Sequence, residues 1–132
     1  MPNLDRRELA AICAGGAAGA LARVWIGENF TTAAGGWPWA TFAINVTGSF
    51  VLAYVATRLQ ERLPLSTYRR PLLGTGFCGA YTTFSTMAVE ILAMIDASHY
   101  GLALAYATAS IGAGFLAIWV ATTIVRRPRV LA

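Results

Sequence analysis

The 132-residue sequence contains no lysine and few charged residues of either sign. Its ten basic residues are all arginine, six residues are acidic, and charged residues make up 12% of the chain against 57% hydrophobic residues. A soluble domain of this size needs a mostly polar exterior, which so few charged side chains do not supply. The composition therefore argues against a soluble domain and predicts an integral membrane protein.

Cysteine and histidine are also scarce. The two cysteines, Cys13 and Cys78, lie in apolar stretches without the paired spacing of a metal or redox motif. Both are expected to act as small hydrophobic side chains. The single histidine, His99, has no Ser-His-Asp or Cys-His set to join. These shortages predict that the protein is not an enzyme.

Four apolar runs are long enough to form membrane-spanning helices. A helix needs about 20 residues to cross a hydrocarbon layer about 30 Å thick. The runs cover residues 9–26, 37–57, 72–95 and 100–125, and the connections between them are too short for an extramembrane domain. We therefore expect an all-α, single four-helix transmembrane domain over residues 1–132, with any activity inside the bilayer.

The arginines gather on one side of the predicted membrane. Four crossings place the N-terminus, the second connection and the C-terminus together, and nine arginines fall there: Arg6, Arg7, Arg58, Arg62, Arg69, Arg70, Arg126, Arg127 and Arg129. The other side has at most Arg23. By the positive-inside rule both termini are expected in the cytoplasm. Because the arginines flank apolar runs, the net charge of +4 does not indicate a nucleic-acid partner.

The second span carries one amide side chain near mid-membrane. Asn45 is followed by Gly48 and Ser49, which share its helical face at i+3 and i+4. Polar side chains at membrane depth either find partners or line water. Asn45 therefore makes an interhelical hydrogen bond or lines a solute path, and the residues alone leave both alternatives open.

The third span has an unusual order of glycines and hydroxyl residues. Three glycines come first and four hydroxyl residues follow: Gly74, Gly76 and Gly79, then Thr82, Thr83, Ser85 and Thr86. We predict a helix break near residues 79–82, which would free backbone carbonyls beside a cavity or protein groups that satisfy them. Carbonyls are hard oxygen ligands for a small cation or for water. The alternative is an intact glycine-rich helix packed closely on a neighbour.

Six side chains of the third and fourth spans are candidates to line a cavity. They are Thr83, Phe84, Met87 and Glu90 in the third span and Tyr106 and Ser110 in the fourth, all at helical spacings of three or four. Such a cavity offers hydroxyl donors and aromatic edges without a fixed positive charge at its centre. That combination suits an anion that must be stripped of water and released again. The alternative is that Phe84 and Met87 are packed core.

Small residues in the first span indicate close helix contacts. Gly15 and Gly19 form a GxxxG pair. In lipid such a pair serves helix packing within one subunit or dimerisation. A lone four-helix unit has scarcely enough interior for a solute path, so we also expect a homo-oligomer.

Three segments of the sequence carry a resemblance to a known family. They are Gly-Gly-Ala-Ala-Gly-Ala-Leu-Ala-Arg at 15–23, Trp-Pro-Trp-Ala-Thr-Phe-Ala-Ile-Asn-Val-Thr-Gly-Ser-Phe at 37–50, and Gly-Phe-Cys-Gly-Ala-Tyr-Thr-Thr-Phe-Ser-Thr at 76–86. In order and in content they resemble the Fluc, also called CrcB, fluoride channels. The likeness extends over nearly the whole chain, and the last segment is highly specific.

The resemblance implies passive export of fluoride across the bacterial inner membrane, which reduces fluoride toxicity. It also implies an antiparallel, dual-topology homodimer with two fluoride pathways along the interface and a sodium ion (Na+) buried at its centre. The implied sodium ligands are the backbone carbonyls of Gly79 and Thr82, two from each subunit. The implied fluoride pathway contains Asn45, Thr83, Phe84, Glu90, Tyr106 and Ser110, with Arg23 in its vestibule.

Two features depart from the family pattern. Met87 stands where many members have a second Phe, and its thioether has no ring quadrupole, so a fluoride site built from two ring edges is in question there. The nine-to-one arginine bias is unlike that of a chain inserted equally in both orientations. Either tertiary features override the rule or an oppositely oriented paralogue completes a heterodimer. We favour the homodimer, because a chain with both Asn45 and the Thr-Thr-Phe segment can supply both halves of a symmetric pore.

Two other functions compete with a channel. A small multidrug-type, proton-coupled exporter is also built from four short helices in an antiparallel dimer, but it needs a carboxylate deep in the membrane, and residues 9–26 contain none. Glu90 lies about 8 Å inside its span end, too peripheral for that role. A non-transporting membrane assembly protein would explain the small residues but not the cluster of hydroxyls.

Overall fold

The computed structural model describes residues 5–33, 35–61 and 67–127. They form α1 (Arg6–Asn29), α2 (Trp39–Glu61), η1 (Pro71–Cys78), α3 (Gly79–Tyr81), α4 (Phe84–Asp96) and α5 (Tyr100–Arg126), and these described residues contain no strand. Four helical regions are long and apolar enough to cross a membrane: α1, α2, the region Pro71–Asp96 made of η1, α3 and α4, and α5. The predicted all-α fold with four membrane-spanning helices is confirmed, and the protein is a multi-pass membrane protein.

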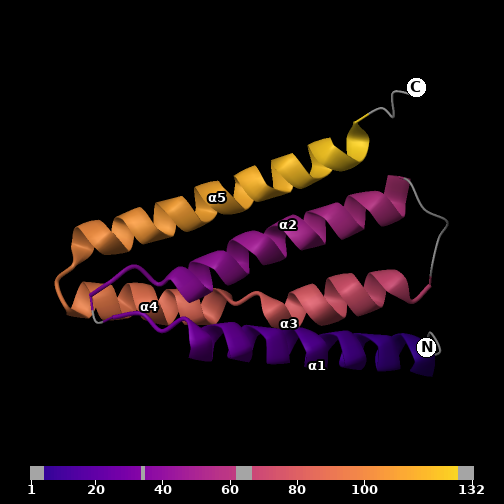
Figure 1. Cartoon of the computed structure of the whole chain (residues 1–132), viewed down its shortest axis with the longest axis horizontal. Helices are drawn as coiled ribbons and strands as arrows, with labels where there is room; N and C mark the ends of the chain where they lie inside the picture. The colour runs from indigo at the N-terminus through magenta and orange to yellow at the C-terminus, as the bar shows by residue number, and fades with distance from the viewer. Residues whose placement is uncertain (1–4, 34, 62–66, 128–132) are drawn as a thin grey trace.

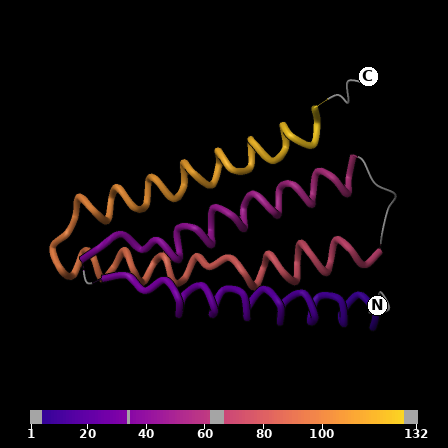
Figure 2. The backbone as a smooth tube through the Cα atoms, in the orientation of Figure 1, coloured from indigo at the N-terminus to yellow at the C-terminus, as the bar shows by residue number. Residues whose placement is uncertain are grey.

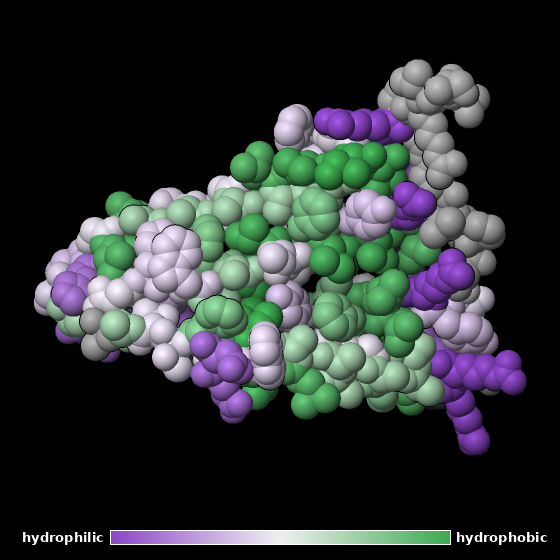
Figure 3. Space-filling view, viewed as in Figure 1, coloured by the Kyte–Doolittle hydropathy of each residue, from purple (hydrophilic) through white to green (hydrophobic). Residues whose placement is uncertain are grey.

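The four spans lie side by side in the order α5, α2, third span and α1 (Figure 1; Figure 2). The start of α1, the end of α2, the start of η1 and the end of α5 meet at one end of the bundle, where hydrophilic surface gathers (Figure 3). This end holds the arginines Arg6, Arg7, Arg58, Arg69, Arg70, Arg126 and Arg127, whereas Arg62 and Arg129 fall outside the described residues. The charge asymmetry expected from the sequence is therefore an asymmetry of the folded bundle.

Local sequence signals explain where several helices begin. The Oδ1 atom of Asp5 accepts a hydrogen bond from the Arg7 N–H at 2.9 Å and caps α1. Pro71 opens η1, where a missing N–H costs no helical bond. η1 itself is a π-helix, whose wider turn the sequence analysis did not predict.

The GxxxG pair of α1 packs against η1 within the same subunit. A Cβ atom on Gly15 would overlap the Leu72 carbonyl, and one on Gly19 would overlap the Phe77 carbonyl. From the other side, a Cβ atom on Gly76 would lie 2.6 Å from the Ile12 oxygen. The two backbones therefore touch, which only glycine permits. Of the two uses open to the pair, packing within one subunit is the one observed.

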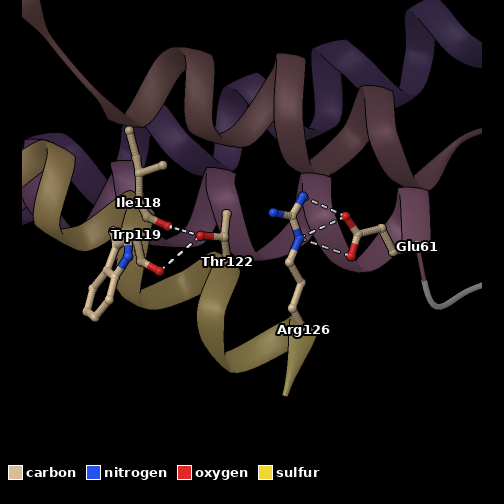
Figure 4. Close-up of polar contacts among 5 residues, drawn as sticks. All are labelled: Glu61, Ile118, Trp119, Thr122 and Arg126. Carbon is tan, nitrogen blue, oxygen red and sulfur yellow. Dashed lines mark hydrogen bonds and ion pairs between the residues drawn. The ribbon is translucent and has the colours of Figure 1, made fainter. Parts of the chain in front are cut away.

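α2 and α5 are joined by an ion pair at the arginine-rich end (Figure 4). The Arg126 guanidinium donates to Glu61 Oε1 from Nη2 at 2.7 Å and from Nε at 3.0 Å. One turn earlier, the Thr122 hydroxyl donates to the Ile118 and Trp119 carbonyls of its own helix at 2.9 Å each. It therefore needs no hydrogen-bond partner on a neighbouring helix. An ion pair this exposed contributes little stability and mainly sets the register of the two helix ends.

The outside of the bundle is apolar over large areas. The exposed fraction reaches 71% for Leu21, 70% for Phe115 and 78% for Phe84. Such a surface is stable against lipid tails or against a second subunit rather than against water.

We predict that Gly15→Ala separates α1 from η1. The added methyl group overlaps backbone, which cannot move aside, so the free energy of unfolding should fall by about 1–3 kcal/mol. The matched control is Gly16→Ala, where the new Cβ atom lies 3.9 Å from its nearest neighbour, and we expect a change within about 0.5 kcal/mol. Denaturant unfolding in detergent measures both variants, and equal stabilities would contradict the backbone contact.

Candidate functional site

The third span is broken at Thr82 and Thr83. Helix α3 ends at Tyr81, and α4 starts at Phe84. The two threonines between them are extended, with φ/ψ of −75°/154° at Thr82 and −147°/111° at Thr83. β-Branched residues tolerate extended backbone well. The structure thus has the broken third helix that the order of glycines and hydroxyls predicted.

The side chain of Asn45 holds the break open. Its Nδ2 donates to the Thr83 carbonyl at 3.0 Å, and its Oδ1 accepts from the Thr83 N–H at 2.8 Å. One amide side chain on α2 therefore pairs with both backbone groups of one residue, which would otherwise lack partners at membrane depth. The interhelical hydrogen bond considered for Asn45 is therefore present. The second N–H of the Asn45 amide group takes no part in the two hydrogen bonds with Thr83.

Two carbonyls at the break lose their helical donors. In an unbroken helix the N–H of Thr83 would reach the Gly79 carbonyl and that of Thr86 the Thr82 carbonyl. Here the Thr83 N–H goes to Asn45, and the Thr86 N–H donates to the Thr83 hydroxyl at 3.2 Å, which caps α4. Gly79 and Thr82 thus present the hard oxygen atoms that Na+ prefers, which fits their expected role. Among the described residues, no group of three or more His, Cys, Asp or Glu side chains offers another metal site.

A pocket of about 270 Å³ opens beside the break. It is lined by nine residues: Asn45, Ser49, Leu52, Thr82, Thr83, Phe84, Met87, Ser110 and Ile111. Six of the site residues predicted from the sequence thus come together here, from α2, the break, α4 and α5. Leu52 and Ile111 were not predicted, because one apolar residue in an apolar helix carries no distinguishing signal.

Some hydrogen-bond donors in this pocket already have a partner in the protein, and others do not. The Ser110 hydroxyl oxygen is buried and has no hydrogen-bond partner among the described residues. The Thr83 hydroxyl donates to Thr86 Oγ1 at 2.9 Å and is therefore engaged locally. None of the described residues that line the pocket carries a charged side chain. Since buried polar atoms are normally paired, the Ser110 hydroxyl and the second N–H of Asn45 are the groups best placed to bind a ligand.

Glu90 and Tyr106 form a separate network toward the opposite end of the bundle. The fully buried Tyr106 hydroxyl donates to Glu90 Oε2 at 2.7 Å, and the buried Thr41 hydroxyl donates to Glu90 Oε1 at 2.6 Å. The Trp37 ring packs edge-on against Tyr106 with centroids 5.4 Å apart. Glu90 lines a second pocket of about 180 Å³ together with His99. Thr41 was missed by the sequence analysis, although it lies one helical turn before Asn45 on the same face.

Arg23 lies neither in the pocket at the break nor in the network of Glu90 and Tyr106. It lies on α1, a helix that packs on η1 and α3, and it is absent from the lining of both pockets. Tyr106 is likewise outside the first pocket, because its side chain is directed to Glu90. The predicted vestibule role of Arg23 and the predicted pathway role of Tyr106 stay predictions.

Residues 10–122 match the family described as CrcB-like protein, Camphor Resistance (CrcB). The chain belongs to the CrcB-like family. A protein of Mycobacterium bovis is 58% identical and one of Mycolicibacterium paratuberculosis is 55% identical, each over 98% of both chains. A protein of Acidobacterium capsulatum is 42% identical over 88% of this chain and 94% of the relative. The first two are named fluoride-specific ion channel FluC 1 and the third fluoride-specific ion channel FluC.

In this CrcB-like chain we predict that Asn45→Leu destabilises the break. The N–H and carbonyl of Thr83 lose their partners at membrane depth, so the free energy of unfolding should fall by about 2–5 kcal/mol. The matched control is Asn29→Leu, because the exposed Asn29 side chain bonds, within the described part of the chain, only to the Trp25 carbonyl of its own helix at 2.8 Å. Thermal unfolding in detergent compares the two, and similar losses in both variants would contradict a special role for Asn45.

Proposed function

We propose that the protein is a fluoride-selective channel that exports cytoplasmic fluoride by passive electrodiffusion across the bacterial inner membrane and so reduces fluoride toxicity. The observation that carries the proposal is the pocket at the helix break, where the buried Ser110 hydroxyl lacks a partner beside the amide of Asn45. The names of the related proteins support fluoride as the ion.

The chemistry of the pocket suits a small, dehydrated anion. Ser110 and Asn45 can donate hydrogen bonds that replace part of the hydration shell. The edge of the Phe84 ring carries the positive end of its quadrupole and can face the ion at modest energy. With no arginine in the lining, the ion is not held too tightly to leave. Narrow walls and short hydrogen bonds favour fluoride over the larger chloride.

Glu90 and Tyr106 extend the proposed pathway beyond the pocket. Two donated hydrogen bonds, from Thr41 and Tyr106, draw negative charge from the Glu90 carboxylate and fix its position. The second pocket beside Glu90 provides room for a hydrated ion to leave. Arg23 is proposed as a vestibule residue whose positive charge raises the local anion concentration.

The working unit is proposed to be an antiparallel, dual-topology homodimer. One subunit leaves Phe84 78% exposed at its pocket and supplies only two of the carbonyls a sodium ion needs. A second copy would cover the pocket and add the Gly79 and Thr82 carbonyls of its own break. Na+ held there would neutralise the facing carbonyl dipoles and fix the two breaks against each other.

The two alternative functions explain fewer features. A small multidrug-type exporter exchanges protons at an accessible deep carboxylate, whereas the Glu90 carboxylate is fixed by two hydrogen bonds. A non-transporting assembly protein has no use for a buried, unpartnered serine hydroxyl in a pocket. Passive permeation also needs no enzymatic step.

We predict that purified protein in liposomes releases fluoride and that Ser110→Ala slows the release at least about tenfold, since one hydrogen bond to a charged ion is lost. The matched control is Thr108→Ala. Among the residues that the structure describes, the Thr108 hydroxyl bonds only to the Leu104 and Ala105 carbonyls of its own helix, so it should be dispensable. A fluoride electrode with valinomycin present measures efflux. Absence of fluoride efflux by the unmodified protein would contradict the proposed channel function. Equal efflux rates for the two variants would show that Ser110 is not part of the pathway.

We predict that both orientations of the chain are present in cells that express only this gene. One cysteine would be introduced at either end of the bundle in a Cys13→Ser background, where the remaining Cys78 is buried. Each new cysteine should react with an impermeant thiol reagent from both sides of the membrane. A single orientation would rule out the antiparallel homodimer and leave the oppositely oriented paralogue as the partner.

A further inference from the structure

A second serine lines the pocket at the break. Ser49 lies on α2 one helical turn after Asn45, so the two side chains share one face of the helix, about 6 Å apart along its axis. The Ser49 side chain is only partly buried, whereas the oxygen of the Ser110 hydroxyl is completely covered. Ser49 therefore adds an open hydroxyl to the wall of the pocket.

The Ser49 hydroxyl makes no hydrogen bond with any of the described residues. Other hydroxyls of the spans bond back to their own helix: that of Thr47, also on α2, donates to the Ala43 carbonyl at 2.6 Å, and that of Thr122 donates to the Ile118 carbonyl at 2.9 Å. Such a bond is the local way to satisfy a hydroxyl in a helix without water. Because Ser49 does not make it, its donor is available to a ligand in the pocket.

Gly114 on α5 keeps the space in front of this hydroxyl open. Helices α2 and α5 pack along each other (Figure 1). Outside its own helix, a Cβ atom on Gly114 would have one described neighbour within 4 Å, the Ser49 oxygen at 3.9 Å. Gly114 also follows Ser110 by one turn on the same face of α5. Two successive turns of α2, with Asn45 and Ser49, thus lie beside two successive turns of α5, with Ser110 and Gly114.

Two ligands in succession suit an ion that must move. Conduction requires binding that is favourable enough for entry and divided over several sites so that the ion can leave again. An anion that leaves the amide of Asn45 meets the next donor, Ser49, about 6 Å further along α2. The step between the two donors is therefore short enough to spare the ion full rehydration.

We propose that Ser49 is a second hydroxyl ligand of the permeating anion, and that Gly114 leaves the room the ion needs beside it. The ligand is a small monovalent anion that has lost part of its water and accepts a hydrogen bond from the Ser49 hydroxyl. This inference rests on the proposed channel function and adds a donor on α2 to the amide of Asn45 and the hydroxyl of Ser110.

The first test moves the hydroxyl from α2 to α5. Ser49→Ala should slow fluoride efflux from liposomes about tenfold, because one hydrogen bond to a charged ion is lost. Adding Gly114→Ser to this variant places a hydroxyl on the facing helix, where the added Cβ atom fits, and should restore most of the lost rate. The matched control adds Gly112→Ser instead. Gly112 is exposed and outside the pocket, so this variant should stay slow.

An unchanged efflux rate for Ser49→Ala, beside active unmodified protein, would overturn the ligand role of Ser49 and leave the channel function intact. Equal rates for the two double variants would show that Ser49 acts through packing and not as a hydroxyl ligand. Absence of efflux from the unmodified protein would instead contradict the channel function.

A second measurement does not depend on fluoride transport. Since the Ser49 hydroxyl has no partner in the described part of the chain, Ser49→Ala should leave the midpoint of thermal unfolding in detergent unchanged or raise it. The matched comparison is Thr47→Ala, which removes a hydroxyl bonded to the Ala43 carbonyl and, at 3.0 Å, to the Tyr81 hydroxyl, and should lower the midpoint. An equal loss in both variants would mean that the protein itself binds the Ser49 hydroxyl, and would contradict its availability to an ion.

Discussion

The double hydrogen bond between the Asn45 side chain and the Thr83 backbone is the interaction on which the rest of the site depends. In a bilayer, two extended residues in a helix would leave backbone groups unsatisfied at a cost of several kcal/mol each. Asn45 supplies a donor and an acceptor at 3.0 and 2.8 Å and removes that cost at Thr83. Because the Thr83 N–H is taken, the Gly79 carbonyl is left for another ligand.

The same break redirects the side chains around it. Phe84 and Met87 start a new helix whose face lines the pocket with Ser110 of α5, and Gly48 on α2 lets Thr82 approach so closely that a Cβ atom there would overlap its methyl group. The glycine contacts of α1 with η1 support the first half of the span from the other side. Small residues next to the break therefore let the helices pack closely enough to bring the polar groups of the pocket together.

The four spans and the break in the third span could be predicted from the sequence. The contacts between distant residues could not, for a physical reason. Run length and arginine position indicate four spans, and the order of glycines and threonines indicates the break, because both are local properties. The pairing of Asn45 with Thr83 and of Thr41 and Tyr106 with Glu90 joins residues 16 to 49 positions apart, which depends on how the helices pack. The π-helix of η1 likewise arises from packing, and no single residue marks it.

The central claim is that an uncharged pocket of hydroxyl, amide and aromatic groups passes a small dehydrated anion and rejects a larger one. The most direct test is the reversal potential of the purified protein in a planar bilayer with fluoride on one side and an equal concentration of chloride on the other. A fluoride-selective pocket gives a large reversal potential, with the sign set by fluoride permeation. A reversal potential near zero would mean that both ions permeate equally and would contradict it.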